Sequence, residues 1–337
     1  MSKKRIYVAY TGGTIGMKKS AQGFIPVPGF LTECVENMPE FFRAEMPEFV
    51  IHEYAPLMDS SDMSPADWLH IAEDIQQNYQ DFDGFVVLHG TDTMAYTASA
   101  LSFMFENLGK PVIVTGSQIP LAALRSDGQT NLLNALYIAA NYPIPEVSLF
   151  FNNTLFRGNR ATKADANGFD AFASPNFPAL LEAGIQIEVV EGKIEAPAHA
   201  PLKLTRVSPQ TIGVITLYPG IDARLFATML AQPVDAIIMQ SYGVGNAPQD
   251  KRLLDVLRAG VAQQTIILNC TQCFRGRVNM GGYATGNALA EAGVISGADM
   301  TIEAALTKLH YLLSKPLEHK QRLALLQADL RGELSLP

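Results

Sequence analysis

The sequence predicts an α/β protein with a larger N-terminal domain built on a mostly parallel sheet and a smaller C-terminal α/β domain. Short apolar runs, rich in β-branched and aromatic residues, alternate with longer segments of helical period, as in folds whose helices connect parallel strands. The alternation stops over residues 191–209, which contain three prolines, and resumes at Gly213. We therefore expect domains at residues 1–195 and 211–337, joined by a linker at 196–210.

Each expected element rests on a local signal. Ser64 followed by Pro65 is typical of a helix start, because serine caps a helix and proline suits its first turn. Further helices are expected over 93–107 and 126–141, and the last residues, RGELSLP, are expected to fray. The expected strands are Arg5–Tyr10, Phe49–Pro56, Gly84–His89, Val112–Thr115, Val147–Phe151, Ile185–Val190, Gly213–Leu217, Ala236–Gln240 and Thr265–Asn269.

Composition argues against several classes of protein. The chain has 337 residues, of which 48% are hydrophobic and 17% charged, as in globular proteins. A net charge of −8 without a basic stripe argues against a nucleic-acid-binding function. No apolar run reaches the roughly 20 residues that span a bilayer, so we expect no membrane partner. The N-terminus is interpreted as a strand and not a signal peptide, and three cysteines suit a reducing compartment, so we expect a cytoplasmic protein.

Small polar residues follow the first four expected strands of the large domain. Ligands of open α/β sheets bind at the carboxyl ends of the strands, so these residues are expected to meet at one edge. Their convergence is the main functional signal in the residues themselves. The segments concerned are Thr11–Thr14, Met58–Asp62, His89–Thr93 and Gly116–Gln118.

The loop after the first strand is compatible with two kinds of site. A phosphate loop is disfavoured, because TGGTIGM lacks both the G-K-[ST] ending and the G-x-G-x-x-G spacing. A nucleophile loop fits better, since Gly12 and Gly13 allow a sharp turn that leaves Thr14 exposed. Taken alone, however, Thr14 is also compatible with a turn cap, and Asp92 with the cap of the next helix.

The longer motifs resemble one family. TGGTIG at 11–16 and HGTDTMAYTASALSF at 89–103 are similar to the two signatures of the asparaginase/glutaminase amidohydrolases that use a threonine nucleophile. The resemblance extends over nearly the whole chain and is strongest to the bacterial type I, cytoplasmic members. It is carried further by MDSSDM at 58–63, TGSQIP at 115–120, RSDGQTNLLNAL at 125–136 and SYGVGNAP at 241–248.

The resemblance implies a reaction and a set of catalytic residues. The reaction would be hydrolysis of L-asparagine to L-aspartate and ammonia, with Thr14 forming an acyl-enzyme. Thr91, Asp92 and Lys163 would form a second hydroxyl–acid–lysine cluster. We expect Lys163 to stay charged and to position the other two. A structural ion pair between Lys163 and Asp92 is the alternative, and no cofactor or metal is implied.

The resemblance also implies how the substrate is held. Asp59, Ser60 and Ser61 would bind the α-carboxylate and α-amino groups of asparagine, together with Thr91 and Asp92. Backbone N–H groups at Thr14 or Thr91 are candidates for stabilising the oxyanion.

The expected lid over the site departs from the family pattern. Residues 17–29 would form this lid, in which the family usually carries a tyrosine whose hydroxyl touches the nucleophile. Phe24 stands at the matching position here. It keeps the ring but lacks the hydroxyl, so either the hydroxyl is dispensable or turnover is slower.

A second departure concerns regulation by asparagine. Related enzymes bind an effector asparagine through an arginine that precedes the SYGVGN motif, whereas this chain has Gln240, which cannot grip a carboxylate with two charged bonds. Two outcomes stay open for the effector site: regulation by asparagine survives, or the site is weakened or lost. Its remaining candidates are Thr162, Thr271 and Cys273, and the Cys270–Cys273 pair is interpreted as structural or effector-lining.

Assembly and two alternative functions complete the expectations. In the family, active sites are completed across a dimer, and two dimers often form a tetramer. Asn246 is the candidate for a contact with the neighbouring subunit, although a plain turn would explain it too.

A catalytically weak amino-acid sensor on the same fold is the main alternative to an asparaginase. An amidotransferase subunit is disfavoured, since that variant carries an extra domain before TGGTI.

Overall fold

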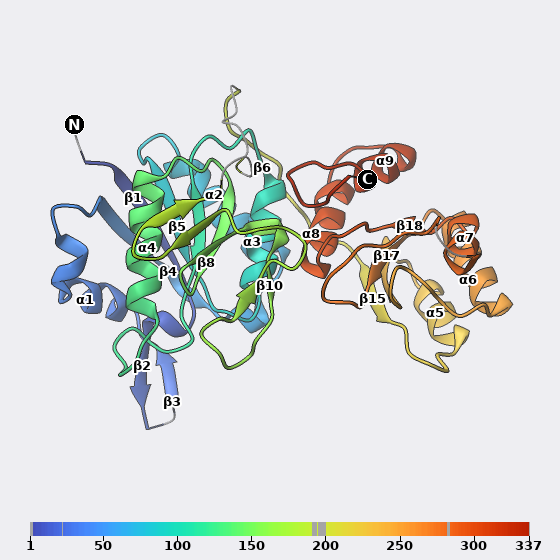
Figure 1. Ribbon diagram of the computed structural model, residues 1–337, viewed down its shortest axis with the longest axis horizontal. Helices are drawn as coiled ribbons and strands as arrows, with labels where there is room; N and C mark the ends of the chain where they lie inside the picture. Colours follow the sequence, from blue (N-terminus) through green and yellow to red (C-terminus); the bar gives the residue numbers. More distant parts are fainter. Residues whose placement is uncertain (1–2, 22, 191–193, 195–199, 282–283, 337) are drawn as a thin grey trace. The chain divides into compact units, whose positions relative to one another are not determined.

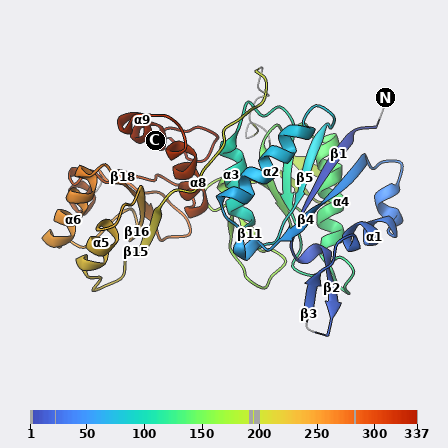
Figure 2. The same ribbon diagram turned by 180° about the vertical axis from the view of Figure 1, so that it is seen from behind.

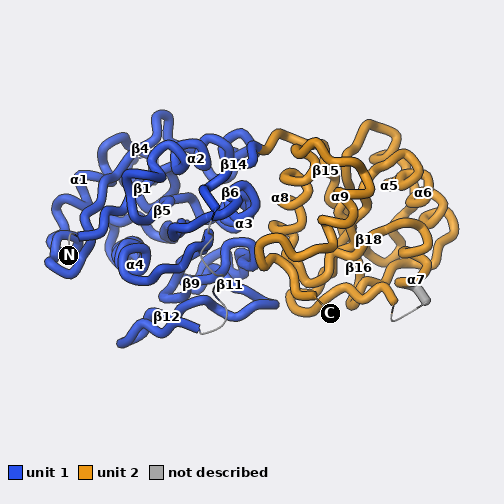
Figure 3. Tube along the Cα trace, turned by 90° about the horizontal axis from the view of Figure 1, so that it is seen from above, with its two compact units in different colours: residues 1–206 blue, residues 207–337 orange. Residues whose placement is uncertain are grey.

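The computed structural model describes residues 3–21, 23–190, 194, 200–281 and 284–336, and the chain divides into two compact units. Unit 1 comprises residues 1–206 and unit 2 residues 207–337 (Figure 3). Of the linker predicted at 196–210, residues 196–199 lie outside the described part. Residues Lys203–Leu204 form strand β14, which pairs antiparallel with β6 (Phe105–Glu106). The predicted domain limits stay a prediction.

Unit 1 is built on an eight-stranded sheet with the order β13-β12-β9-β8-β7-β5-β1-β4. The neighbours from β4 to β8 are parallel, whereas β9, β12 and β13 add to the sheet in antiparallel fashion. The predicted mostly parallel sheet is therefore confirmed. The strands are β1 Arg5–Gly12, β4 Glu48–Met58, β5 Gly84–Leu88, β7 Val112–Thr115, β8 Val147–Phe151, β9 Thr154–Arg157, β12 Leu181–Ala183 and β13 Ile187–Val189.

Helices cover both faces of this sheet, as apolar strands require on either side. The residues of β5, β7 and β8 are all buried. On one face, α1 (Phe30–Glu36) and α4 (Gly128–Asn141) share a core with Ile6, Val8 and Tyr10 of β1 (Figure 1). On the opposite face lie α2 (Pro65–Asn78) and α3 (Met94–Met104) (Figure 2).

The predicted start of α2 is confirmed in detail. The Ser64 side chain and the Asp67 carboxylate form a capping box, with Pro65 in the first turn. Asp67 accepts the Ser64 backbone N–H at 2.7 Å. These bonds satisfy N–H groups that the helix leaves unpaired, and they fix where α2 begins.

Two small hairpins of unit 1 contribute to the candidate site. The first joins β2 (Met17–Ser20) to β3 (Gly23–Pro26) and occupies the segment predicted to form a lid. The second joins β10 (Thr162–Lys163) to β11 (Phe172–Ala173), with Lys163 opposite Phe172.

Unit 2 repeats the α/β principle on a smaller scale, which confirms the predicted second α/β domain. Its sheet has the order β15-β16-β17-β18, and all three pairings are parallel. The strands are β15 Ile212–Thr216, β16 Ala236–Ser241, β17 Ile266–Thr271 and β18 Ile295–Ser296; the helices are α5 Ala223–Leu230, α6 Lys251–Ala262, α7 Ala284–Glu291, α8 Ile302–Leu313 and α9 His319–Gln327. Among the described residues of both units, no helix is long and apolar enough to cross a membrane.

The C-terminal segment is packed and hydrogen-bonded as far as Ser335. The expectation that the last residues fray was therefore wrong for residues 331–335. Glu333 is fully buried, and its carboxylate lies 2.5 Å from the ammonium of Lys308 on α8, which is buried as well. Lys308 also donates to the carbonyls of Leu326 and Ala328. Burial opposes ionisation of Glu333, but the adjacent ammonium and backbone N–H groups outweigh it and lower its pKa. No local pattern signals this contact, because the partner lies 25 residues upstream.

We predict that Lys308→Met destabilises the protein by about 3–5 kcal/mol, because it leaves the Glu333 carboxylate buried without a countercharge. Urea denaturation at pH 7 measures this loss. Lys4→Met is the matched control, because its ion pair with Asp83 is exposed and such pairs contribute less than about 1 kcal/mol. The loss should shrink as the pH is lowered, since protonation neutralises the unpaired Glu333. Equal effects of the two substitutions would contradict this account.

Candidate active site

The ends of β1, β4 and β5 approach one another closely, and glycines permit this approach. A Cβ atom on Gly13 would overlap the backbone nitrogen of Gly90, and one on Gly12 would overlap the carbonyl oxygen of Met58. Both glycines have positive φ, 141° for Gly12 and 93° for Gly13. A Cβ on Gly90 would likewise overlap the Ser60 side chain. The expected convergence of these loops is therefore a feature of the structure.

Thr14 is the first residue of a 3-10 turn, Thr14–Gly16, that follows β1 directly. It is the one residue between Thr11 and Gly16 that keeps partial exposure, whereas Ile15 beside it is buried in the core and anchors the turn. Within the described part of the chain, no side chain or backbone group forms a hydrogen bond with the Thr14 hydroxyl. That hydroxyl is thus available to a ligand, while no base is yet bonded to it.

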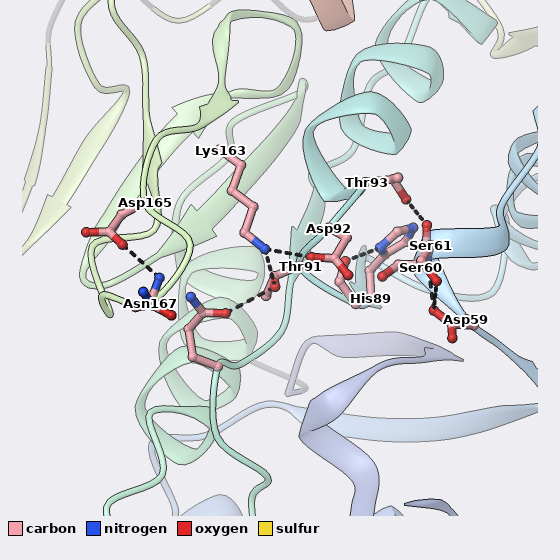
Figure 4. A network of polar contacts seen from close by, with 12 residues as sticks. Asp59, Ser60, Ser61, His89, Thr91, Asp92, Thr93, Lys163, Asp165 and Asn167 are labelled. Atoms are coloured by element: carbon pink, nitrogen blue, oxygen red, sulfur yellow. Dashed lines mark hydrogen bonds and ion pairs between the residues drawn. The ribbon is translucent and has the colours of Figure 1, made fainter. Parts of the chain in front are cut away.

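Thr91, Asp92 and Lys163 form one hydrogen-bonded cluster (Figure 4). Lys163 Nζ donates to Thr91 Oγ1 at 3.0 Å and to Asp92 Oδ1 at 2.8 Å. Thr91 and Asp92 follow β5 and Gly90, so they adjoin the loop whose Gly13 precedes Thr14. The structure thus brings together the three residues predicted as a second cluster.

The ion pair in this cluster contributes more to geometry than to stability. The Lys163 side chain is 21% exposed and the Asp92 side chain 63% exposed, so water screens their attraction. Lys163 does not follow one of the parallel strands, because it belongs to the β10–β11 hairpin. A cation held at this place, partly shielded by Thr91, is suited to stabilising negative charge or to passing a proton.

Asp59, Ser60 and Ser61 lie at the end of β4, in a second polar group beside the first. Asp59 accepts the backbone N–H of Ser61 at 2.9 Å and its hydroxyl at 2.8 Å. These two bonds lower the pKa of the Asp59 carboxyl, so it is ionised at neutral pH. Thr93 Oγ1 donates to the Ser60 carbonyl at 2.6 Å and so ties this group to the Thr91 loop.

His89 is bonded to Gly90 and to Thr97 of α3, and Cys270 and Cys273 lie in unit 2. Burial lowers the pKa of His89 to about 4, and its two ring nitrogens contact the Gly90 carbonyl at 2.7 Å and Thr97 Oγ1 at 2.8 Å. Cys270 is buried, which raises its thiol pKa to about 12, while Cys273 is exposed. Among the described residues, no three His, Cys, Asp or Glu side chains are grouped to hold a metal ion.

The lid residue and the predicted cross-subunit residue lie in different elements. Phe24 belongs to β3, which packs near the turn carrying Thr14, and it is 48% exposed. Asn246 closes a tight turn in unit 2, where it exchanges backbone hydrogen bonds with Tyr242 at 2.9 Å.

Three of the four effector candidates lie at the carboxyl ends of β16 and β17 in unit 2. Gln240 accepts a hydrogen bond from Thr216 Oγ1 at 2.7 Å. Thr271 Oγ1 donates to the Gly243 carbonyl at 2.5 Å and accepts the Cys273 backbone N–H at 3.0 Å. The fourth candidate, Thr162, belongs to β10 of unit 1. The side chain at position 240 is therefore already engaged within its own sheet.

Gln118 is a site residue that the sequence patterns left without a role. It follows β7 closely, and its side chain lies between Thr91 and Gly168. The available signal was its position in Gly116–Gln118, one of the segments expected at the carboxyl ends of the strands. Nothing in that segment indicated which neighbour the amide would contact.

Comparison with known proteins gives matches over both units. A family model for the N-terminal part of asparaginases matches residues 5–195, and a glutaminase/asparaginase C-terminal domain model matches residues 211–326. The chain is 65% identical to L-asparaginase 1 of Escherichia coli, with 99% of each chain covered. It is also 45% identical to the 60 kDa lysophospholipase of Mus musculus, where it covers 63% of that protein.

A solved structure agrees with these sequence matches. The crystal structure of L-asparaginase I from Vibrio cholerae has a TM-score of 0.94 and 62% identity, covering 99% of this chain and all of that one. The match extends over both α/β units. The chain therefore belongs to the asparaginase family and is an amidohydrolase.

Proposed function

We propose that this protein hydrolyses L-asparagine to L-aspartate and ammonia through an acyl-enzyme on Thr14. The observation that carries the proposal is the bonded Thr91–Lys163–Asp92 cluster, placed on the loop that touches the Thr14 loop through Gly13 and Gly90. Relatives that the chain matches over nearly their full length are named L-asparaginases, which supports the choice of substrate.

In the first half of the reaction, Thr14 Oγ1 attacks the side-chain amide carbon of asparagine. A C–O bond forms, the C–N bond breaks, and the hydroxyl proton ends on the nitrogen that leaves as ammonia. Backbone N–H groups at the Thr14 and Thr91 turns are the proposed donors to the oxyanion. Because the Thr14 hydroxyl has no base bonded to it among the described residues, its activation requires the substrate or a movement of the lid hairpin.

In the second half, water attacks the ester carbon and releases aspartate, and the proton of water returns to Thr14 Oγ1. Thr91 and Lys163 are proposed to orient this water and to stabilise the negative charge that develops. Asp59, Ser60, Ser61 and Asp92 are proposed to bind the α-amino and α-carboxylate groups of the substrate. The carboxylates of Asp59 and Asp92 suit an ammonium, and the serine hydroxyls suit a carboxylate.

We also propose a cytoplasmic homo-oligomer, a dimer or a dimer of dimers, with Asn246 near the neighbouring subunit. The asparagine effector site is proposed to be weak, because Gln240 replaces a charged side chain and is bonded to Thr216.

A weak amino-acid sensor is the second candidate function. It is favoured by Phe24 and by a Thr14 hydroxyl that has no hydrogen-bond partner among the described residues, and it predicts binding of asparagine without release of ammonia.

We predict that Thr14→Ala lowers the initial rate of ammonia release by at least about a thousandfold, because it removes the nucleophile. Thr14→Ser is the matched control, since it retains a hydroxyl in the same turn and should keep measurable activity. The rate is measured against L-asparagine concentration. Substantial activity in Thr14→Ala would contradict the proposed nucleophile.

The same measurement on the wild type tests the effector site. A sigmoidal dependence of the rate on asparagine concentration supports that site, and a hyperbolic dependence opposes it.

We predict that Lys163→Met lowers kcat by about 10²–10⁴-fold, because the cluster loses its cation and the donor to Thr91. Lys203→Met serves as the control, since Lys203 forms an exposed ion pair with Glu106 on the surface and should leave kcat unchanged. Steady-state kinetics and thermal unfolding of both variants measure the effect. If Lys163→Met retains wild-type kcat, the ion pair with Asp92 is only structural.

We predict that Phe24→Tyr raises turnover and leaves the melting temperature unchanged. Phe24 is 48% exposed on the β2–β3 hairpin, so a hydroxyl can be added without burying a polar group. Exposed Phe42→Tyr is the matched control, because it adds the same group away from the site. An unchanged or lower kcat in Phe24→Tyr would show that this position contributes no hydroxyl to the reaction.

A further inference from the structure

The orientation of the Gln118 amide is fixed by its two partners. Gln118 Nε2 lies 3.0 Å from the Gly168 carbonyl oxygen, and Oε1 lies 3.1 Å from Thr91 Oγ1. A carbonyl oxygen only accepts, so the atom that faces Gly168 must be the amide nitrogen. The amide oxygen then faces Thr91 and also only accepts. The Thr91 hydroxyl is therefore the donor in its bond to Gln118.

This assignment accounts for most of the bonding capacity of the Thr91 hydroxyl. A hydroxyl has one hydrogen and two lone pairs. The hydrogen is directed at Gln118, and one lone pair accepts from Lys163 Nζ at 3.0 Å. One lone pair remains, so Thr91 meets an approaching water or substrate as a hydrogen-bond acceptor. Without Gln118 the same hydroxyl could turn its hydrogen towards the ligand.

Gln118 is held independently of its side chain. Its backbone N–H donates to both carboxylate oxygens of Asp127, at 3.1 and 2.9 Å, and the next N–H, of Ile119, donates to Asp127 Oδ1 at 3.0 Å. On the other side, Asp165 Oδ1 accepts the backbone N–H of Gly168 at 2.9 Å, which fixes the turn that presents the Gly168 carbonyl. Both ends of the link are thus built by the fold before a ligand arrives.

We propose that Gln118 is a positioning residue that accepts the Thr91 hydroxyl hydrogen and keeps the Thr91 oxygen as an acceptor for the water that hydrolyses the acyl-enzyme. The inference rests on the proposed function and assigns a further residue to it. Gln118 moves no proton itself, since a neutral amide neither gains nor loses a proton near neutral pH. It also connects Thr91 to the hairpin that carries Lys163, so this hairpin holds Thr91 directly through Lys163 and indirectly through Gln118.

The test is the kinetics of Gln118→Met in the full-length protein, with ammonia release from L-asparagine as the readout. Gln118 borders a surface pocket of about 510 Å³, so methionine has room. We expect kcat to fall about tenfold, as for the loss of one well-placed hydrogen bond. KM should change less than about threefold, and the melting temperature should stay unchanged. Gln77→Met on α2 is the matched control, since Gln77 is exposed.

A double-mutant cycle separates action through Thr91 from a general effect. In Thr91→Val the hydroxyl is absent, so adding Gln118→Met should lower kcat no further. A further tenfold loss in the double variant would overturn the inference, as would wild-type kcat in Gln118→Met. If wild-type protein releases no ammonia, the proposed function fails instead, and the two failures are thereby distinguished.

Gln118→Glu provides a second readout should Thr91→Val be too slow to measure. In this variant the ionised carboxylate accepts from Thr91 but cannot donate to Gly168, whereas the protonated carboxyl group can do both. Because the ionised carboxylate keeps the acceptor for Thr91, Gln118→Glu should retain a higher kcat at neutral pH than Gln118→Met, which offers Thr91 no comparable acceptor. A kcat of Gln118→Glu as low as that of Gln118→Met would contradict the role assigned to Gln118.

Discussion

The site depends on one steric constraint, the close approach of the chain at the carboxyl ends of β1, β4 and β5. At Gly12, Gly13 and Gly90 the neighbouring chain occupies the space that a Cβ would need. Parallel strands bring their carboxyl ends to one edge, but side chains would keep the loops apart. Because these positions carry only hydrogen, Thr14 and Thr91 each follow a glycine that touches the other loop. The two threonines proposed to act in catalysis thus owe their proximity to packing.

The polar contacts add direction to this proximity. Lys163 and Gln118 both bond to Thr91, and both are linked to the β10–β11 hairpin, one by its own backbone and one through Gly168. Asp59 and Thr93 fix the adjoining group in the same way. Most of these bonds are partly exposed, so each adds little to stability. Their contribution is preorganisation, which matters more for a transition state than for folding.

The parallel strands and the loops at their carboxyl ends could be predicted from the sequence, because apolar runs and glycine-rich turns are local signals. Thus β1, β5, β7, β16 and β17 were predicted close to their true bounds. Contacts between distant segments left no such signal. Neither the Glu333–Lys308 pair, nor the antiparallel strand β12, nor the amide link of Gln118 is encoded in a local pattern. The position of Lys163 was implied by resemblance alone.

The central claim is that Thr14 carries the acyl group, and peptide mapping of the enzyme during turnover tests it most directly. Carbon-labelled L-asparagine would be mixed with the wild-type protein, quenched in acid within one turnover, and the digest analysed by mass spectrometry. The account predicts an aspartyl ester on the peptide that contains Thr14, formed together with a burst of ammonia. Label on the peptide that contains Thr91, or an ammonia burst without label on Thr14, would contradict it.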